Sequence, residues 1–228
     1  MALGITLATG SAAMAATWEV TLTNLTHGNH FTPLLVTAHD QNTHLFEVGA
    51  AASAAIEDMA ECGSLAALEA IVVTADTVSN PNSGFLDPGD NTSAMLTDPA
   101  GTHLSIVAMV LPTNDAFMGL ESQLIPTDAG TYTYWVNAYD AGTEQNDEIL
   151  STSGTCAASD SGMMPGAPGG NAGSGATGVT STEDANTMIH IHRGVLGDDN
   201  DSGGKSDLDN TIHRWQNPVA KITVKVTP

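Results

Sequence analysis

Basic residues are scarce in this chain of 228 residues. Five Lys and Arg stand against 26 Asp and Glu, which gives a formal net charge of −21. So few cations cannot neutralise a run of phosphates, which argues against nucleic-acid binding. The same shortage argues against attraction to an anionic membrane surface. The excess of acids fits both a well-solvated extracellular surface and a protein that binds cations, and charge alone does not separate the two.

Long apolar runs are also missing. No segment approaches the roughly 18 apolar residues that a membrane-spanning helix needs, so we expect no membrane span. A short apolar stretch and Ala13-Met14-Ala15, an A-x-A cleavage pattern, predict a signal peptide over 1–15, although no Lys or Arg precedes the stretch. We therefore expect one mature domain over 17–228 in a secreted, cell-surface or periplasmic protein.

Cysteine is nearly absent, since Cys62 and Cys156 are the only two. In an exported protein an even pair of cysteines predicts one disulfide. It would tie a region rich in helix formers to a long polar segment. Two free thiols are the alternative.

Known catalytic motifs are absent as well. The chain has no G-x-S-x-G, no H-E-x-x-H and no phosphate loop of the form G-x-x-x-x-G-K-[ST]. We therefore expect a protein that is not an enzyme, and a metal-dependent hydrolase is the least favoured class.

What is present is a series of short apolar segments separated by turn residues. Residues 17–25 alternate, with Trp18, Val20 and Leu22 on one face, and 103–111 is a nearly continuous apolar run typical of a strand buried on both faces. The other expected strands lie at 31–39, 92–96, 132–139, 188–196 and 215–226. Seven or eight strands of this kind predict an all-β fold, an antiparallel β-sandwich.

Two segments interrupt this pattern. Residues 45–73 favour a short helical insertion of two helices, capped by Ser53 and Ser64. Residues 151–186 are rich in Gly, Ser, Ala and Pro and predict a long polar loop.

The aromatic segment 132–139 leads directly into a cluster of acids over 140–148. A strand that delivers Asp140, Glu144, Asp147 and Glu148 to a turn suits a hard cation, because Ca²⁺ prefers oxygen ligands. If the strand over 104–111 ends at the same rim, Asp115 joins them. The alternative is that Asp115 and Asp140 only cap turns.

Several segments, in this order, resemble the spondin N-terminal domain family. They are NLTHGNHFTPLLVTAH (24–39), THLFEVGAAAS (43–53), LSIVAMVLPTNDAFMGL (104–120), YDAGTE (139–144), HRGVLG (192–197) and RWQNPVAKITV (214–224). The Pro-x-x-Asp turn and the Asp-Ala-Gly-Thr-acid turn are the most specific parts.

The resemblance implies a C2-like β-sandwich and a calcium site of three acids. On matching positions these are Asp115, Asp140 and Glu144, with Glu144 where the family more usually has Asp. It also implies a non-catalytic role in adhesion or extracellular binding, with an unknown extracellular protein or surface ligand as partner. Asp147 and Glu148 are then left in the loop beyond the site.

A second acidic loop covers 198–209. Asp199, Asp201 and Asp207 suggest another calcium site, but the spacing lacks the Gly and the final Glu of an EF-hand. A solvated polar loop is the favoured interpretation.

The eight histidines suggest a transition-metal alternative. Imidazoles suit copper. His39 and His44 flank a turn and His103 begins the apolar run, and the ends of different strands can converge in a sandwich. The chain also has a weaker resemblance in kind to copper-responsive surface proteins of methane-oxidising bacteria, some of which hold Cu(I) with two histidines and an oxidised tryptophan. No such motif aligns here. The alternative function is a copper-binding surface or periplasmic protein.

Overall fold

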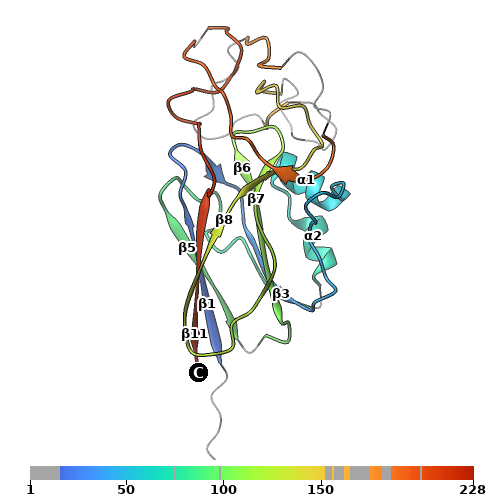
Figure 1. The fold of residues 1–228 in the computed structure, drawn as a ribbon, viewed down its shortest axis with the longest axis vertical. Helices are drawn as coiled ribbons and strands as arrows, with labels where there is room; N and C mark the ends of the chain where they lie inside the picture. The colour runs from blue at the N-terminus through green and yellow to red at the C-terminus, as the bar shows by residue number, and fades with distance from the viewer. Residues whose placement is uncertain are drawn as a thin grey trace, which may run out of the picture.

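The computed structural model describes residues 16–73, 75–97, 99–151, 156, 162–164, 175–180, 186–200 and 202–228. The expected signal peptide and much of the expected loop over 151–186 lie outside these residues. The described chain forms two antiparallel sheets that pack face to face, with two short helices (Figure 1). The prediction of an all-β sandwich is confirmed.

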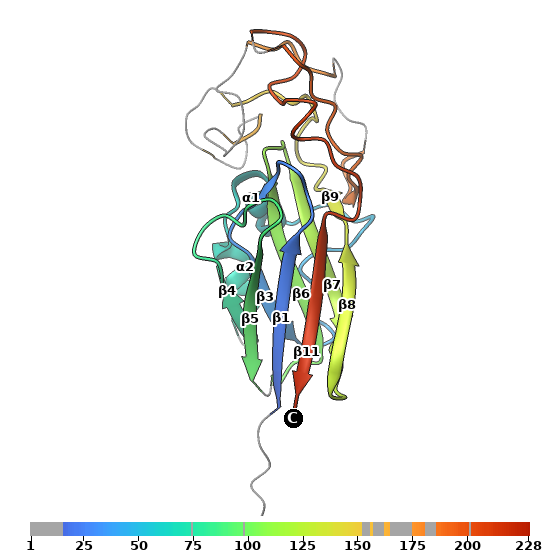
Figure 2. The same cartoon turned by 90° about the vertical axis from the view of Figure 1, so that its left-hand side faces the viewer.

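The first sheet has four strands, which lie side by side in Figure 2. Their order is β5 (Asn91–Thr97), β1 (Thr17–Asn24), β11 (Ala220–Thr227) and β8 (Gly130–Val136). The alternation in β1 buries Trp18, Val20 and Leu22, as expected, because they face the second sheet. Trp18 lies opposite Val226 in β11, so the register of this strand pair places apolar residues of both strands on the face toward the core.

The second sheet is built around β6 (His103–Leu111), which is buried along most of its length. Its order is β10 (His190–Ile191), β9 (Ala138–Asp140), β7 (Ala116–Leu124), β6, β3 (Leu35–His39) and β4 (Asp76–Ser79), with β2 (His30–Phe31) paired to β6. Ile106 and Ala108 face the first sheet. Val107 and Met109 face the helices, so β6 is buried on both faces as its apolar run predicts.

The helices α1 (Ala54–Cys62) and α2 (Ala66–Ile71) cover the outer face of the second sheet. Ser53 Oγ accepts a hydrogen bond from Ile56 N at 3.3 Å, so the predicted cap is confirmed. The cap predicted at Ser64 is wrong, since α2 begins after Leu65 and no side chain caps it. Neither helix is long and apolar enough to span a membrane, and no other helix occurs in the described residues.

Several predicted strands are shorter or broken. The segment 132–139 is two strands in different sheets, because the chain changes sheets at Asn137. There Ala138 N donates to Asn217 Oδ1 at 2.7 Å in place of a ladder bond. The segment 31–39 is interrupted around Pro33, which lacks an N–H. Only His190–Ile191 of 188–196 is a strand, and the last strand begins at Ala220 rather than 215. Neither β4 nor β7 was predicted.

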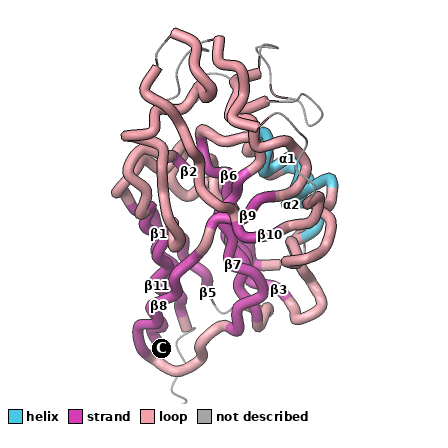
Figure 3. The backbone as a smooth tube through the Cα atoms, turned by 45° about the horizontal axis from the view of Figure 1, so that its top comes forward, coloured by secondary structure: helices cyan, strands magenta, loops and turns pink. Residues whose placement is uncertain are grey.

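Loops gather at one end of the sandwich, opposite the C-terminus (Figure 3). We call the described residues of 141–219 the loop cap. Apart from β10, strand pairing within it is limited to two isolated bridges. Carboxylate side chains accept hydrogen bonds from backbone N–H groups that strand pairing would otherwise satisfy. Glu148 accepts hydrogen bonds from Leu196 N at 2.6 Å, Gly197 N at 2.8 Å and Ser206 Oγ at 2.6 Å.

Two acids of 198–209, the partly exposed Asp198 and the buried Asp207, also hold loop backbone. Asp198 accepts hydrogen bonds from the backbone N–H groups of Asn200, Lys205 and Ser206, which lower the pKa of its carboxyl. Asp207 is buried and accepts from Leu150 N at 2.8 Å, and Asp201 lies outside the described residues. The acids therefore organise the loop, which favours the interpretation as a polar loop over a second calcium site.

A disulfide joins Cys62, the last residue of α1, to Cys156 across a sequence separation of 94. The predicted bond is confirmed, and it fixes a residue of the polar segment 151–186 against α1.

Removing this bond by the double substitution Cys62→Ala and Cys156→Ala is expected to lower the free energy of unfolding by about 2–5 kcal/mol, because the unfolded chain regains the freedom of a long closed loop. Urea unfolding followed by circular dichroism measures the change. Reduced parent protein serves as the control and should match the double variant. A variant as stable as the oxidised parent would contradict the expectation.

Candidate functional site

Strand pairing brings two of the predicted acids together at the rim beneath the loop cap. Asp115 precedes β7, and Asp140 is the last residue of β9. Because β7 and β9 pair with Ala116 opposite Asp140, the two acids become neighbours, and Ala141 N donates to the Asp115 carbonyl at 3.3 Å. Both are buried, with exposed fractions of 0% and 3%.

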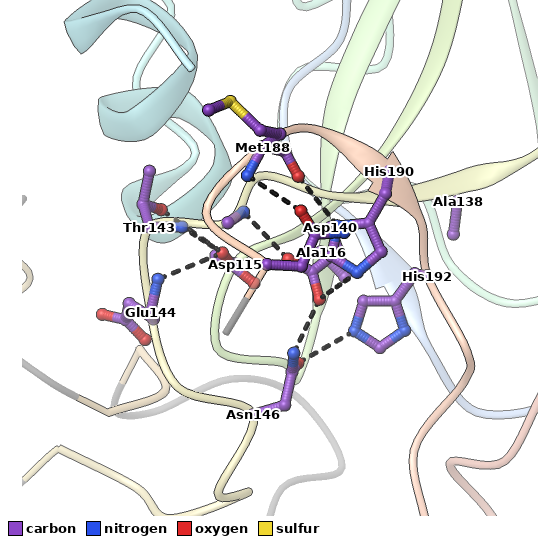
Figure 4. A network of polar contacts seen from close by, with 12 residues as sticks. Asp115, Ala116, Ala138, Asp140, Thr143, Glu144, Asn146, Met188, His190 and His192 are labelled. Carbon is purple, nitrogen blue, oxygen red and sulfur yellow. Dashed lines mark hydrogen bonds and ion pairs between the residues drawn. The ribbon is translucent and has the colours of Figure 1, made fainter. Parts of the chain in front are cut away.

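The Asp115 carboxylate is satisfied on one oxygen only. Its Oδ2 accepts hydrogen bonds from Thr143 N at 2.9 Å, Glu144 N at 3.1 Å and Thr143 Oγ1 at 3.3 Å (Figure 4). Its Oδ1 is buried and has no hydrogen-bond partner among the described residues. A buried carboxylate oxygen without a donor is costly unless something positive reaches it.

The Asp140 carboxylate holds the turn that follows β9. Its Oδ1 accepts from Gly142 N at 2.8 Å, and its Oδ2 accepts from Asn146 Nδ2 at 2.6 Å. Gly142 has a φ of 72°, and a Cβ there would lie 2.6 Å from the Thr187 carbonyl carbon, so only glycine fits this turn. His190 Nε2 lies 3.7 Å from Asp140 Oδ2.

Asn146 is positioned in turn by a buried histidine that sequence reasoning did not assign. Its Oδ1 accepts from His192 Nε2 at 3.2 Å, while His192 Nδ1 accepts from Gly194 N at 3.0 Å. An imidazole that donates from one nitrogen and accepts at the other is neutral, so the contacts select the Nε2–H tautomer. The only signal in the sequence is the pair His190 and His192, two apart on one expected strand.

Glu144 lies on the far side of Asp115 from Asp140 (Figure 4). Burial raises the pKa of its carboxyl to about 9, with further contributions from the negative charges of Glu61 and Asp115. Its Oε2 is buried without a hydrogen-bond partner among the described residues. Glu61 is itself buried near the end of α1, and no sequence pattern pointed to it.

The rim therefore concentrates acidic side chains in a buried place, where ionising all of them is costly. Burial is the main cause that raises the pKa of Asp115 to about 7, and the charge of Asp140 adds to it. The three hydrogen bonds to Asp115 Oδ2 oppose this rise without cancelling it. The structure thus places Asp115, Asp140 and Glu144 in one cluster and adds Glu61 to it.

The chemistry of this cluster fits a hard cation, since Ca²⁺ prefers carboxylate oxygens. Two of these oxygens, Asp115 Oδ1 and Glu144 Oε2, have no hydrogen-bond donor among the described residues. As the side chains lie, however, no three His, Cys, Asp or Glu in the described part of the chain are arranged to hold a metal. The carboxylates would have to move closer together on binding.

The three histidines of the copper alternative lie near one another at the other end of the second sheet. His39 and His103 are opposite each other in β3 and β6, with ring centroids 6.5 Å apart. His39 Nδ1 lies 2.8 Å from the Asp40 carbonyl and Nε2 lies 2.8 Å from Ser105 Oγ. His44 Nδ1 contacts Glu121 Oε1 at 3.1 Å. The copper site stays a prediction.

Comparison with known families gives a match. The Spondin_N family model matches residues 21–160, more than half of the chain. The matched region includes Asp115, Asp140 and Glu144, and it ends before β10 and β11. A search of curated proteins found no match.

The raised pKa values predict how stability depends on pH when a chelator keeps the protein free of metal. The folded state holds the protons of Asp115 and Glu144 more tightly than the unfolded state, whose values are 3.8 and 4.5. Rising pH therefore favours unfolding, and the free energy of unfolding falls from about pH 4 to about pH 9. Urea unfolding at several pH values measures this slope.

In Asp115→Asn, the free energy of unfolding is expected to depend less on pH between about pH 4 and about pH 7, since the amide cannot ionise. Asp128→Asn, which changes an exposed acid away from the rim, should keep the parent slope. An unchanged slope in Asp115→Asn would contradict this account of the buried charge.

Proposed function

The chain belongs to the Spondin_N family of secreted, extracellular domains, and we propose that it is a non-catalytic domain that binds Ca²⁺ at the rim. The proposed ligands are the carboxylates of Asp115, Asp140 and Glu144. The observation that carries the proposal is the buried Asp115 carboxylate, whose Oδ1 has no donor among the described residues and whose pKa is raised to about 7. A bound cation would remove both costs.

Calcium is favoured over other metals by the chemistry of the ligands. Carboxylates, backbone carbonyls and water suit a hard cation, and the irregular shell of Ca²⁺ tolerates ligands from flexible turns. The rim offers such turns, because Asp115 precedes β7 while Asp140 and Glu144 frame the turn after β9. Mg²⁺ would demand a stricter octahedral arrangement.

When bound, the cation would supply positive charge between two turns that already touch. Asn146 and the backbone N–H of Gly142 hold the Asp140 carboxylate, and Thr143 holds Asp115. Neutralising these acids stabilises the base of the loop cap, where loops can contact a partner. We propose that this partner is an extracellular protein or surface ligand, consistent with a role in adhesion or extracellular binding.

Calcium is expected to raise the melting temperature relative to EGTA, with about 2.7 kcal/mol of added stability at a free concentration about 100-fold above Kd. Asp140→Asn should remove most of this gain, because it deletes a proposed ligand while keeping the shape of the side chain. Thermal melts and calorimetric titration measure the two effects.

Asp90→Asn is the matched control, since Asp90 is exposed and lies outside the rim, and it should respond to calcium like the parent. If the melting temperature ignores both calcium and EGTA, and Asp140→Asn behaves like the parent, the proposal fails.

The alternative function, copper binding through His39, His44 and His103, has one observation in its favour. Pairing of β3 with β6 sets the rings of His39 and His103 side by side. Both nitrogens of His39 contact protein groups, so copper would have to displace Asp40 or Ser105. Metal analysis after loading with Cu(I) under reducing conditions tests it, and protein that retains no copper would rule it out.

A further inference from the structure

A cavity of about 510 Å³ opens beside β7 and the corner between β8 and β9. Loop residues 44–48 form one side of it. Three aromatic side chains, Phe46, Trp135 and Tyr139, and two acids, Glu47 and Glu121, line it. None of the proposed calcium ligands lines it, so this second site is independent of the calcium proposal, and it shares His44 with the copper alternative.

Close packing holds one wall of the cavity rigid. Phe46 packs edge-on against Phe117 with centroids 5.0 Å apart, and its centroid lies 5.2 Å from that of Tyr139. The Phe46 ring also lies against Gly119 of β7, where a Cβ would come within 2.6 Å of Phe46 Cζ. Gly119 therefore permits this placement of the aromatic ring.

Trp135 completes the aromatic lining in an exposed position. Its neighbours Tyr134 and Val136 pack into the core, so alternation along β8 turns the indole outward, and 62% of the residue is exposed. A large aromatic side chain left in water beside a cavity is a common feature of binding sites. Lys221 lies opposite Trp135 in β11 but is not among the residues that line the cavity.

The cavity contains two acids, and the basic group among its described lining residues is His44, whose Nδ1 lies 3.1 Å from Glu121 Oε1. Glu121 is fixed by Leu45 N, which lies 3.2 Å and 3.3 Å from its two oxygens, and by Ser105 Oγ at 3.1 Å. Burial raises the pKa of the Glu121 carboxyl, so a cation beside it would favour the ionised form. Glu47 is exposed. Among the described residues that line the cavity, no Lys or Arg occurs, which disfavours an anionic ligand.

We propose that this cavity binds an organic ammonium ion, held by the aromatic faces of Trp135 and Tyr139 and by the carboxylates of Glu47 and Glu121. Aromatic faces attract cations through their quadrupole, and nearby carboxylates add direct charge attraction. The volume accommodates an ammonium group that carries several carbon atoms. The ligand is either a free amine or a lysine side chain of a partner protein, which share this chemistry.

Calorimetric titration of the full chain with three probes at constant calcium tests the proposal. Choline represents a free organic cation, Nα-acetyl-lysine amide represents a protein side chain, and 3,3-dimethyl-1-butanol is a neutral analogue of choline. We expect at least one charged probe to bind at least 10-fold more tightly than the neutral analogue. The tighter charged probe identifies the source.

Variants separate this site from general attraction to an acidic protein. Trp135→Leu should weaken binding of the charged probe about 3- to 30-fold. Glu47→Gln should weaken it as well, whereas Glu69→Gln, an equal loss of charge on the exposed face of α2, should leave it unchanged. Circular dichroism confirms that each variant is folded.

Three outcomes would overturn the proposal. They are no binding of either charged probe up to millimolar concentration, equal binding of the neutral analogue, and equal loss in Glu47→Gln and Glu69→Gln. None of these outcomes affects the proposed calcium site, which is tested separately by melting temperatures and by Asp140→Asn.

Discussion

Hydrogen bonds from backbone N–H groups to carboxylates are the interaction on which the loop cap depends. The sandwich satisfies its own backbone through strand ladders, whereas the loop cap has little regular pairing among its described residues. Glu148 and Asp198 each collect several N–H groups there, and Asp115 does so where the cap meets the sandwich. Side-chain oxygens thus replace missing backbone partners, as the cost of a buried N–H without an acceptor requires.

The same arrangement creates the candidate site. Carboxylates recruited to hold turns also carry charge, and at the rim several of them meet in a buried place. Asp115 shows both effects at once, since Oδ2 accepts backbone hydrogen bonds while Oδ1 lacks a donor among the described residues. Structural and cation-binding interpretations of these acids are therefore compatible. Along the second sheet, Glu121 likewise ties a loop to β7 and lines the cavity proposed to bind ammonium.

Local patterns predicted the parts of the fold that depend on local rules. Alternation identified β1, the continuous apolar run identified β6, and Ser53 marked the start of α1. The predictions failed where contacts with residues distant in sequence determine the local structure. Asn217 helps divide 132–139 by accepting the N–H of Ala138, 79 residues away in sequence, and Glu148 appeared to be an ordinary loop acid. Such partners leave no periodic signal, because each serves a single contact.

The sequence by itself determined the β-sandwich, the cysteine pair and the two acidic turns, because hydrophobic period, residue count and turn composition are local properties. Only the tertiary structure determined which residues lie next to those acids. The pairing of β7 with β9 makes Asp115 and Asp140 neighbours, and the fold brings Glu61 of α1 near Glu144. It also decided that Trp135 faces water beside a cavity. Burial, register and charge proximity arise only when segments far apart in the chain pack together.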